Sequence, residues 1–248
     1  EPILFSSNRN LVREMGDEMT PALENIRGNY NPDEGCQAAL NFLTAMSYMR
    51  ENKYDKAIDM LEVINEKSES RFSSYIAWSL AISYLKKEAF NKAIDYYQKC
   101  FEKLTQHIKP SELTTLWKNR GVCHRLDTKY KEALDCFQQM LSINRDANQN
   151  RDEALALYHI GRTYQDWEKY EQAIDYYQQS KNIYQQLSRD KDVANRWFWL
   201  GNCYRLWGKY EQAVEYQYQC LTIRNQLDDQ ASIALAYFQL GWIYSDWG

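Results

Sequence analysis

The 248-residue sequence predicts an all-α protein made of stacked helical hairpins. In segment 157–164, apolar residues stand at i, i+3, i+4 and i+7. Segment 170–177 repeats that spacing after a short polar break, as expected of two helices. The chain holds only 9 Gly and 4 Pro, which suits helices. One glycine recurs every 40 residues, at Gly121, Gly161, Gly201 and Gly241. A constant period indicates one helix pair per repeat.

The period assigns the elements in order. Helix pairs are expected at 36–50/54–67, 71–86/90–105, 110–126/130–145, 151–166/170–186 and 190–206/210–226, followed by a helix from 230. The array therefore covers residues 35–248, with about five helix pairs and the first helix of a sixth. Gly161 and Ala173 are small residues on facing arms, so we expect them to be in contact.

Residues 1–34 do not fit the period. Their apolar spacing predicts a helix over 9–27, bent or restarted at Pro21, that caps the first repeat. The alternative is a linker segment inherited from an upstream domain. Trp247 and Gly248 stand where another second helix would begin, so we expect a longer parent protein.

The repeated residues resemble the tetratricopeptide repeat, which has aromatic–x–x–Leu–Gly–x–x–Tyr on its first helix and Tyr–x–x–Ala on its second. The residues that carry the resemblance in one unit are Trp197, Leu200, Gly201, Tyr204, Tyr210 and Ala213. The usual period is about 34 residues. The longer period here is similar to that of kinesin light chain, Pins-type polarity adaptors and bacterial signalling arrays. The resemblance implies a right-handed α-solenoid of antiparallel helix pairs.

Composition argues against several kinds of partner and site. The net charge is −4 and no basic block occurs, so no nucleic-acid partner is expected. No apolar run is long enough for a membrane span. The six cysteines show no Cys–x–x–Cys pair, and three histidines accompany them, so neither a metal site nor another cofactor is expected. Reduced, packed thiols favour a cytoplasmic protein.

No catalytic motif is present, and the sequence is not expected to be an enzyme. It has neither a glycine-rich phosphate loop nor Gly–x–Ser–x–Gly. His124 replaces a packing tyrosine and is predicted to be a core residue. His159 is expected beside the inner face, at the surface or against a ligand.

In the family that the repeats resemble, first helices line a concave groove where ligands bind. The resemblance assigns two sets of inner positions. The apolar set is Phe42, Met46, Trp78 and Ile82. The aromatic and cationic set is Lys118, Arg125, Tyr158, Arg162, Phe198, Asn202, Arg205, Phe238 and Trp242. Arginine forks bind carboxylates, so the second set suits an acidic peptide. Alternatively, these side chains only pack neighbouring helices together. The chaperone-tail clamp needs an Asn where this chain has Val122, so that ligand is not predicted.

Three functions remain open. The first is a non-catalytic adaptor that binds a protein segment in its groove. The second is a regulatory sensor in a larger signalling enzyme or NTPase, where other domains of the same chain would be the partners. The third is a peptide-pheromone receptor.

Overall fold

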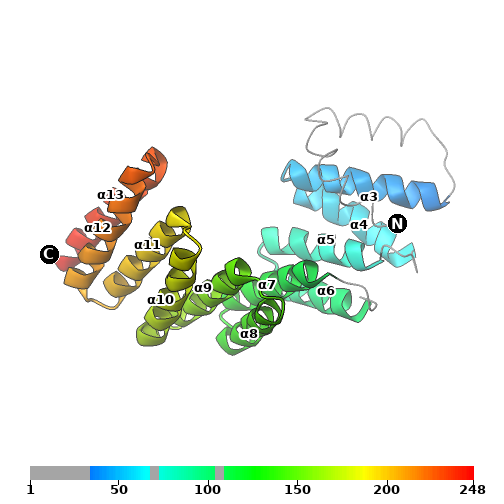
Figure 1. Cartoon of the computed structure of the whole chain (residues 1–248). Helices are drawn as coiled ribbons and strands as arrows, with labels where there is room; N and C mark the ends of the chain where they lie inside the picture. Colours follow the sequence, from blue (N-terminus) through cyan, green and yellow to red (C-terminus); the bar gives the residue numbers. More distant parts are fainter. Residues whose placement is uncertain (1–33, 68–72, 104–108) are drawn as a thin grey trace. The chain divides into compact units, whose positions relative to one another are not determined.

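The computed structural model describes residues 34–67, 73–103 and 109–248 (Figure 1). Eleven helices lie within these residues: α3 (Glu34–Arg50), α4 (Tyr54–Lys67), α5 (Ser73–Lys86), α6 (Phe90–Lys103), α7 (Pro110–Leu126), α8 (Tyr130–Asp146), α9 (Asn150–Asp166), α10 (Tyr170–Gln186), α11 (Asp190–Leu206), α12 (Tyr210–Gln226) and α13 (Gln230–Trp247). The predicted boundaries agree within two residues wherever the helix ends are described. The helix predicted over 9–27 lies outside the described residues.

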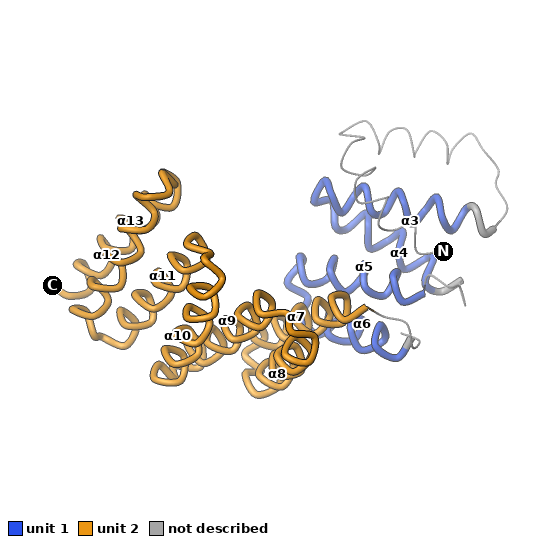
Figure 2. Tube along the Cα trace, in the orientation of Figure 1, with its two compact units in different colours: residues 1–107 blue, residues 108–248 orange. Residues whose placement is uncertain are grey.

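The chain divides into two compact units, residues 1–107 and 108–248 (Figure 2). The described helices of unit 1 are α3 to α6, and those of unit 2 are α7 to α13. Within each unit, the helices of one pair pack against each other along their length, and each pair packs on the next. The all-α solenoid predicted from the 40-residue period is confirmed.

Three of the recurring glycines, Gly121, Gly161 and Gly201, mark close approaches between the helices of their pairs. A methyl group placed on Gly161 would lie 2.8 Å from the Tyr177 ring and 3.2 Å from the carbonyl oxygen of Ala173. The expected contact between Gly161 and Ala173 is therefore present. Gly121 meets Phe137 in the same way, so a side chain at this position would push the two helices apart.

Tryptophans at the C-terminal ends of first helices join consecutive repeats of unit 2. Trp167 stacks on Tyr130 of the preceding repeat, with ring centroids 5.8 Å apart. The pair Tyr170–Trp207 has the same arrangement at 6.2 Å, and Tyr210–Trp247 has it at 6.1 Å. The 40-residue recurrence of Trp thus reflects a ladder of aromatic contacts between neighbouring pairs.

Helices in both units end in one kind of turn. In the turn after α9, Glu168 has φ 61°, its N–H donates to the Gln165 carbonyl, and the next N–H donates to the Tyr164 carbonyl. This is the double hydrogen bond of a Schellman motif, which satisfies the last carbonyls of the helix. Glycine occupies the left-handed position in the turn after α11, as Gly208, whereas the turn after α7 uses the β-branched Thr128.

Among the described residues, no helix has the length and apolar character needed to cross a bilayer.

Candidate functional site

The first helices of unit 2 form the inside of its curve. α7 contacts α9 and α11 contacts α13, although a second helix separates each of these pairs in sequence. Within the described residues, no contact of similar extent joins α8 to α10 or α10 to α12. α9 and α11 also lack a contact of that extent within the described residues, so the closer approach of first helices is seen at the α7–α9 and α11–α13 junctions. In Figure 1 the first helices α7, α9, α11 and α13 follow one another along one side of unit 2. We call this side the inner surface.

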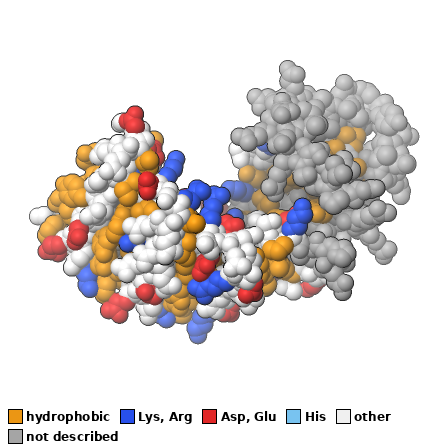
Figure 3. Space-filling view, viewed as in Figure 1, with side chains coloured by type: hydrophobic (Ala, Val, Ile, Leu, Met, Phe, Trp, Pro, Cys, Tyr) orange, Lys and Arg blue, Asp and Glu red, His pale blue; other side chains and the backbone are white. Residues whose placement is uncertain are grey.

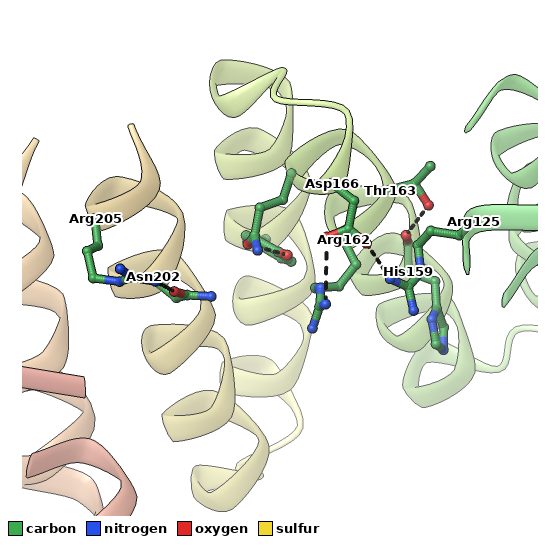
Figure 4. Close-up of polar contacts among 9 residues, drawn as sticks. Arg125, His159, Arg162, Thr163, Asp166, Asn202 and Arg205 are labelled. Atoms are coloured by element: carbon green, nitrogen blue, oxygen red, sulfur yellow. Dashed lines mark hydrogen bonds and ion pairs between the residues drawn. The ribbon is translucent and has the colours of Figure 1, made fainter. Parts of the chain in front are cut away.

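Two arginines of the inner surface converge on one carboxylate. Arg125 of α7 donates from Nη1 to Asp166 of α9. Arg162 approaches the other oxygen of the same carboxylate at 3.7 Å (Figure 4). The three side chains are only 13–27% exposed, so solvent screens this pair of contacts weakly. Asp166 therefore joins α7 to α9 and neutralises one of two positive charges.

A similar contact joins the last two inner helices. Arg205 of α11 donates to Asp246 of α13, and its other terminal nitrogen lies 3.3 Å from the Asn202 amide oxygen. The predicted cations are thus on neighbouring first helices, but Arg125, Arg162 and Arg205 each have an acidic partner. The sequence spacing contains a signal for two of these pairs, because both Arg125–Asp166 and Arg205–Asp246 are separated by 41 residues.

Aromatic rings separate the cations along the inner surface. The Arg162 guanidinium lies 3.9 Å from the ring centroid of Trp199, a residue outside the predicted groove set. Tyr158 also contacts Trp199, with centroids 6.0 Å apart. On α13, Phe238 and Trp242 contact each other at 4.7 Å, yet they are 56% and 46% exposed. The predicted aromatic residues therefore include a large exposed apolar area.

Arg196 of α11, which lies outside the predicted groove set, is buried against α9 and α10. Its guanidinium lies 4.1 Å from the Tyr158 ring centroid and 5.2 Å from that of Tyr184. The residue is 5% exposed, and its Nε is buried without a hydrogen-bond partner in the described residues. No carboxylate of the described residues forms an ion pair with it. Arg196 is held by aromatic faces alone, as a cation–π arrangement allows.

His159 lies among these cations. Its ring stacks on Phe137 at 5.0 Å, and the residue is partly exposed. Burial lowers the pKa of His159 to about 3, and the nearby charges of Arg125, Lys118, Arg196 and Arg162 act in the same direction. The imidazole is therefore neutral at pH 7. Figure 3 shows Lys and Arg side chains gathered on this side of unit 2.

The apolar set predicted for the groove belongs to unit 1 and packs within it. Phe42 is buried, and Met46, Trp78 and Ile82 are partly buried. Ser79 contributes a weak hydrogen bond to the Met46 sulfur at 3.6 Å. The cover predicted for this set is residues 1–34, and all of it except Glu34 lies outside the described residues.

Some polar residues are core residues instead of site residues. Gln165 occupies an inner position of the repeat register, but it is buried and accepts a hydrogen bond from the Tyr177 hydroxyl at 3.0 Å. His124 is buried, as predicted, and burial lowers its pKa. Five cysteines are buried and form no disulfide: Cys100, Cys123, Cys136, Cys203 and Cys220. Within the described ranges, no cluster of His, Cys, Asp or Glu has the arrangement of a metal site.

Several solved structures have the same fold. The apo form of RapI has a TM-score of 0.72 at 17% identity, over 85% of this chain and 78% of its own. PH0952 from Pyrococcus horikoshii, a signal transduction ATPase with numerous domains and a tetratricopeptide repeat sensor, has a TM-score of 0.68 at 19% identity, over 94% of this chain. This chain spans only 36% of PH0952.

A putative kinesin light chain from Podosopora anserina with nearly identical repeats has a TM-score of 0.67 at 13% identity, over 81% of this chain and 100% of its own. At these identities the likeness is one of fold. No curated protein matches the sequence.

Family models match three parts of the sequence. Each is described as a tetratricopeptide repeat, and they match residues 38–68, 111–186 and 194–227. Together these matches cover more than half of the chain, and they coincide with helix pairs of the structure. The chain belongs to the tetratricopeptide repeat family.

Proposed function

We propose that this protein is a non-catalytic scaffold that binds a protein or peptide segment along the inner surface of unit 2. The observation that carries the proposal is the pair of exposed aromatic side chains, Phe238 and Trp242, beside a row of cations on consecutive first helices. Aromatic rings and arginines are the side chains that most often dominate binding energy in protein interfaces. An Asn amide among them can pair with a peptide backbone.

Two further observations support an extended, acidic partner. The cations stand on α7, α9 and α11, so they follow one direction along the stack. They also lie on a protein of net charge −4, where a concentration of positive charge is not needed for solubility. Among the similar structures, a Rap protein is described in complex with competence and sporulation factor. A cytoplasmic location is part of the proposal, supported by five buried cysteines that form no disulfide.

Site-specific photocrosslinking in the full chain tests the proposal. A photoreactive phenylalanine analogue at Phe238 should capture a discrete partner from cell extract, with capture reduced at high salt. Tyr218 on α12 provides the matched control, because it is 52% exposed and lies on a second helix. Capture of the same species with equal yield from both positions, or from Tyr218 alone, would place the interface elsewhere.

A charge reversal provides an independent test with the captured partner. Arg162→Glu should weaken binding at least about tenfold because it removes a cation from the centre of the inner surface. Lys131 on α8 is exposed and serves as the control for net charge. Lys181 is less suitable, since its ammonium lies 4.3 Å from the Trp197 ring centroid. Equal losses from Arg162→Glu and Lys131→Glu would indicate general electrostatics instead of a defined surface.

A further inference from the structure

We infer that α13 is a dimerisation helix, which pairs with α13 of a second copy of this chain through Tyr237, Gly241 and Tyr244. We call these three residues the dimer face. The inference goes beyond the proposed function, which assigns Phe238 and Trp242 of the same helix to a different partner. Three features of α13 support it: an open packing position, an uncharged exposed side and a large exposed apolar area.

In the preceding repeat, a ring of the second helix fills the position that is open on α13. The Tyr216 ring of α12 contacts both Trp197 and Tyr204 of α11, with centroids 5.3 and 4.9 Å away. Forty residues later, Tyr237 and Tyr244 take the places of Trp197 and Tyr204, and they are 59% and 49% exposed. α13 therefore presents to solvent the residues that receive a second helix in the preceding repeat.

The glycine between these tyrosines allows a close approach. A methyl group placed on Gly241 would meet nothing within 4 Å, whereas one on Gly161 would lie 2.8 Å from the Tyr177 ring. No side chain of the described residues therefore covers the backbone of α13 at this point. A second helix can approach the backbone here as the helices of a complete repeat approach each other.

The exposed side of α13 carries no charge. Its exposed residues before Asp246 are all uncharged: Ala231, Ala234, Leu235, Tyr237, Phe238, Gly241, Trp242, Tyr244 and Ser245. Asp246 is the only charged residue of this helix, and Arg205 opposes it. A two-fold interface brings residues near the axis close to their counterparts in the second copy. A charge there would be repelled by its counterpart, so an uncharged face favours a second copy over a charged segment as the occupant.

The dimer face is self-complementary when the two α13 helices are antiparallel. At a rise of about 1.5 Å per residue, Tyr237 lies about 6 Å from Gly241 along the helix axis, and Tyr244 lies about 4.5 Å away on the other side. A two-fold axis beside Gly241 therefore brings each Tyr244 within about 1.5 Å, along the axis, of the second copy's Tyr237. The same aromatic contact forms twice.

The pairing completes an aromatic stack found in the preceding repeat. There, Tyr204 stacks on Trp207 at 6.3 Å and on Tyr216 at 4.9 Å. Tyr244 stacks on Trp247 at 6.3 Å but, within the described residues, on no second ring. A tyrosine of the second copy's dimer face supplies that ring. Because Trp247 already holds Tyr244 in place, less conformational entropy is lost when the second copy binds.

The exposed apolar area sets the expected strength. Leu235, Phe238 and Trp242 border the dimer face, and the five large side chains of this side of α13 are 46–59% exposed. An aromatic side chain covers about 150–250 Å², so two copies can bury at most about 1,000 Å² in total. This is the lower limit for a specific interface, so we expect a weak, reversible dimer.

Sedimentation velocity of the purified 248-residue chain, from micromolar to sub-millimolar concentration, tests the dimer. We expect an equilibrium between monomer and dimer without larger species, because a two-fold interface is closed. Tyr237→Asp should raise the dissociation constant at least about tenfold, since it places an unpaired carboxylate in the interface. Leu126→Asp is the matched control, because Leu126 is 45% exposed at the end of α7 and the net charge changes equally. Its dimer should persist.

Gly241→Leu distinguishes a packed interface from an apolar surface that adheres without specificity. The position is open in a single copy, so the variant should fold, and circular dichroism checks this. The added side chain makes the exposed side more apolar but holds the two helices apart. A packed dimer should therefore weaken. Stronger association of Gly241→Leu would indicate non-specific adhesion and overturn the inference.

Three other results would also overturn it. They are a chain that stays monomeric at every concentration, species that grow beyond the dimer, and equal losses from Tyr237→Asp and Leu126→Asp. These outcomes are separable from the proposed function. A monomeric chain that still captures a partner at Phe238 would refute only the dimer.

Discussion

Gly161→Ala should test the close contact on which the repeat depends. The added methyl would lie 2.8 and 2.9 Å from two carbons of the Tyr177 ring and 3.2 Å from the Ala173 carbonyl oxygen. Tyr177 is fully buried and its hydroxyl is bonded to Gln165, so the ring has little room to move. Overpacking of this kind costs about 1–3 kcal/mol. The better helix propensity of Ala offsets about 1 kcal/mol. We expect a net loss of up to about 2 kcal/mol.

Gly241→Ala is the matched control for this substitution. Gly241 occupies the same register on α13, but a methyl there would meet nothing within 4 Å. The variant should therefore gain up to about 1 kcal/mol from helix propensity alone. Urea denaturation followed by circular dichroism gives both free energies of unfolding, and hydrogen exchange of α9 and α10 localises the effect. Shifts of equal sign and size in the two variants would refute the contact.

Three further predictions concern the turns, the ion pairs and acid stability. Thr128→Gly should raise the free energy of unfolding by about 1 kcal/mol, because a β-branched residue is strained at φ 58°; no gain in urea denaturation would contradict this. Asp166→Asn should lower that free energy by about 1–2 kcal/mol by removing the partner of Arg125 and Arg162. The same variant should bind a peptide of six glutamates (hexaglutamate) more tightly, because it removes a negative charge from the inner surface. An unchanged affinity in calorimetry would contradict an effect of local charge on binding. The pKa of His159 is about 3 in the folded chain and about 6.5 in an unfolded one. The folded state therefore binds fewer protons, and stability should fall as the pH drops from about 6.5 towards 3. His159→Phe should reduce this slope in urea denaturation at several pH values, and an unchanged slope would show that other groups cause it.

Most of the fold is predictable because the residues that make the packing contacts recur from one repeat to the next. The residues of the Gly161–Ala173 approach and of the Tyr130–Trp167 stack recur at intervals of 40 residues. Several series of residues with the same spacing are not expected by chance. The helix ends of unit 2 are equally predictable, since each lies at the same phase of the period.

The site is only partly predictable, because periodicity identifies positions and not partners. The period assigns Arg125 correctly to a first helix, but the carboxylate that pairs with it, Asp166, lies in the next repeat. Arg196 escapes the pattern for the opposite reason: its position is a core position in other repeats, so periodicity assigns it to packing. A charged residue at a position that is otherwise apolar is the signal that the sequence offers.

The central claim is that the inner surface of unit 2 binds an acidic segment. Its most direct test is a backbone amide NMR titration of the full chain with hexaglutamate. The account predicts chemical-shift changes concentrated on α7, α9, α11 and α13, around Lys118, Arg162 and Phe238, and reduced by salt. Changes concentrated on α8, α10 and α12, or no saturable change at all, would contradict it.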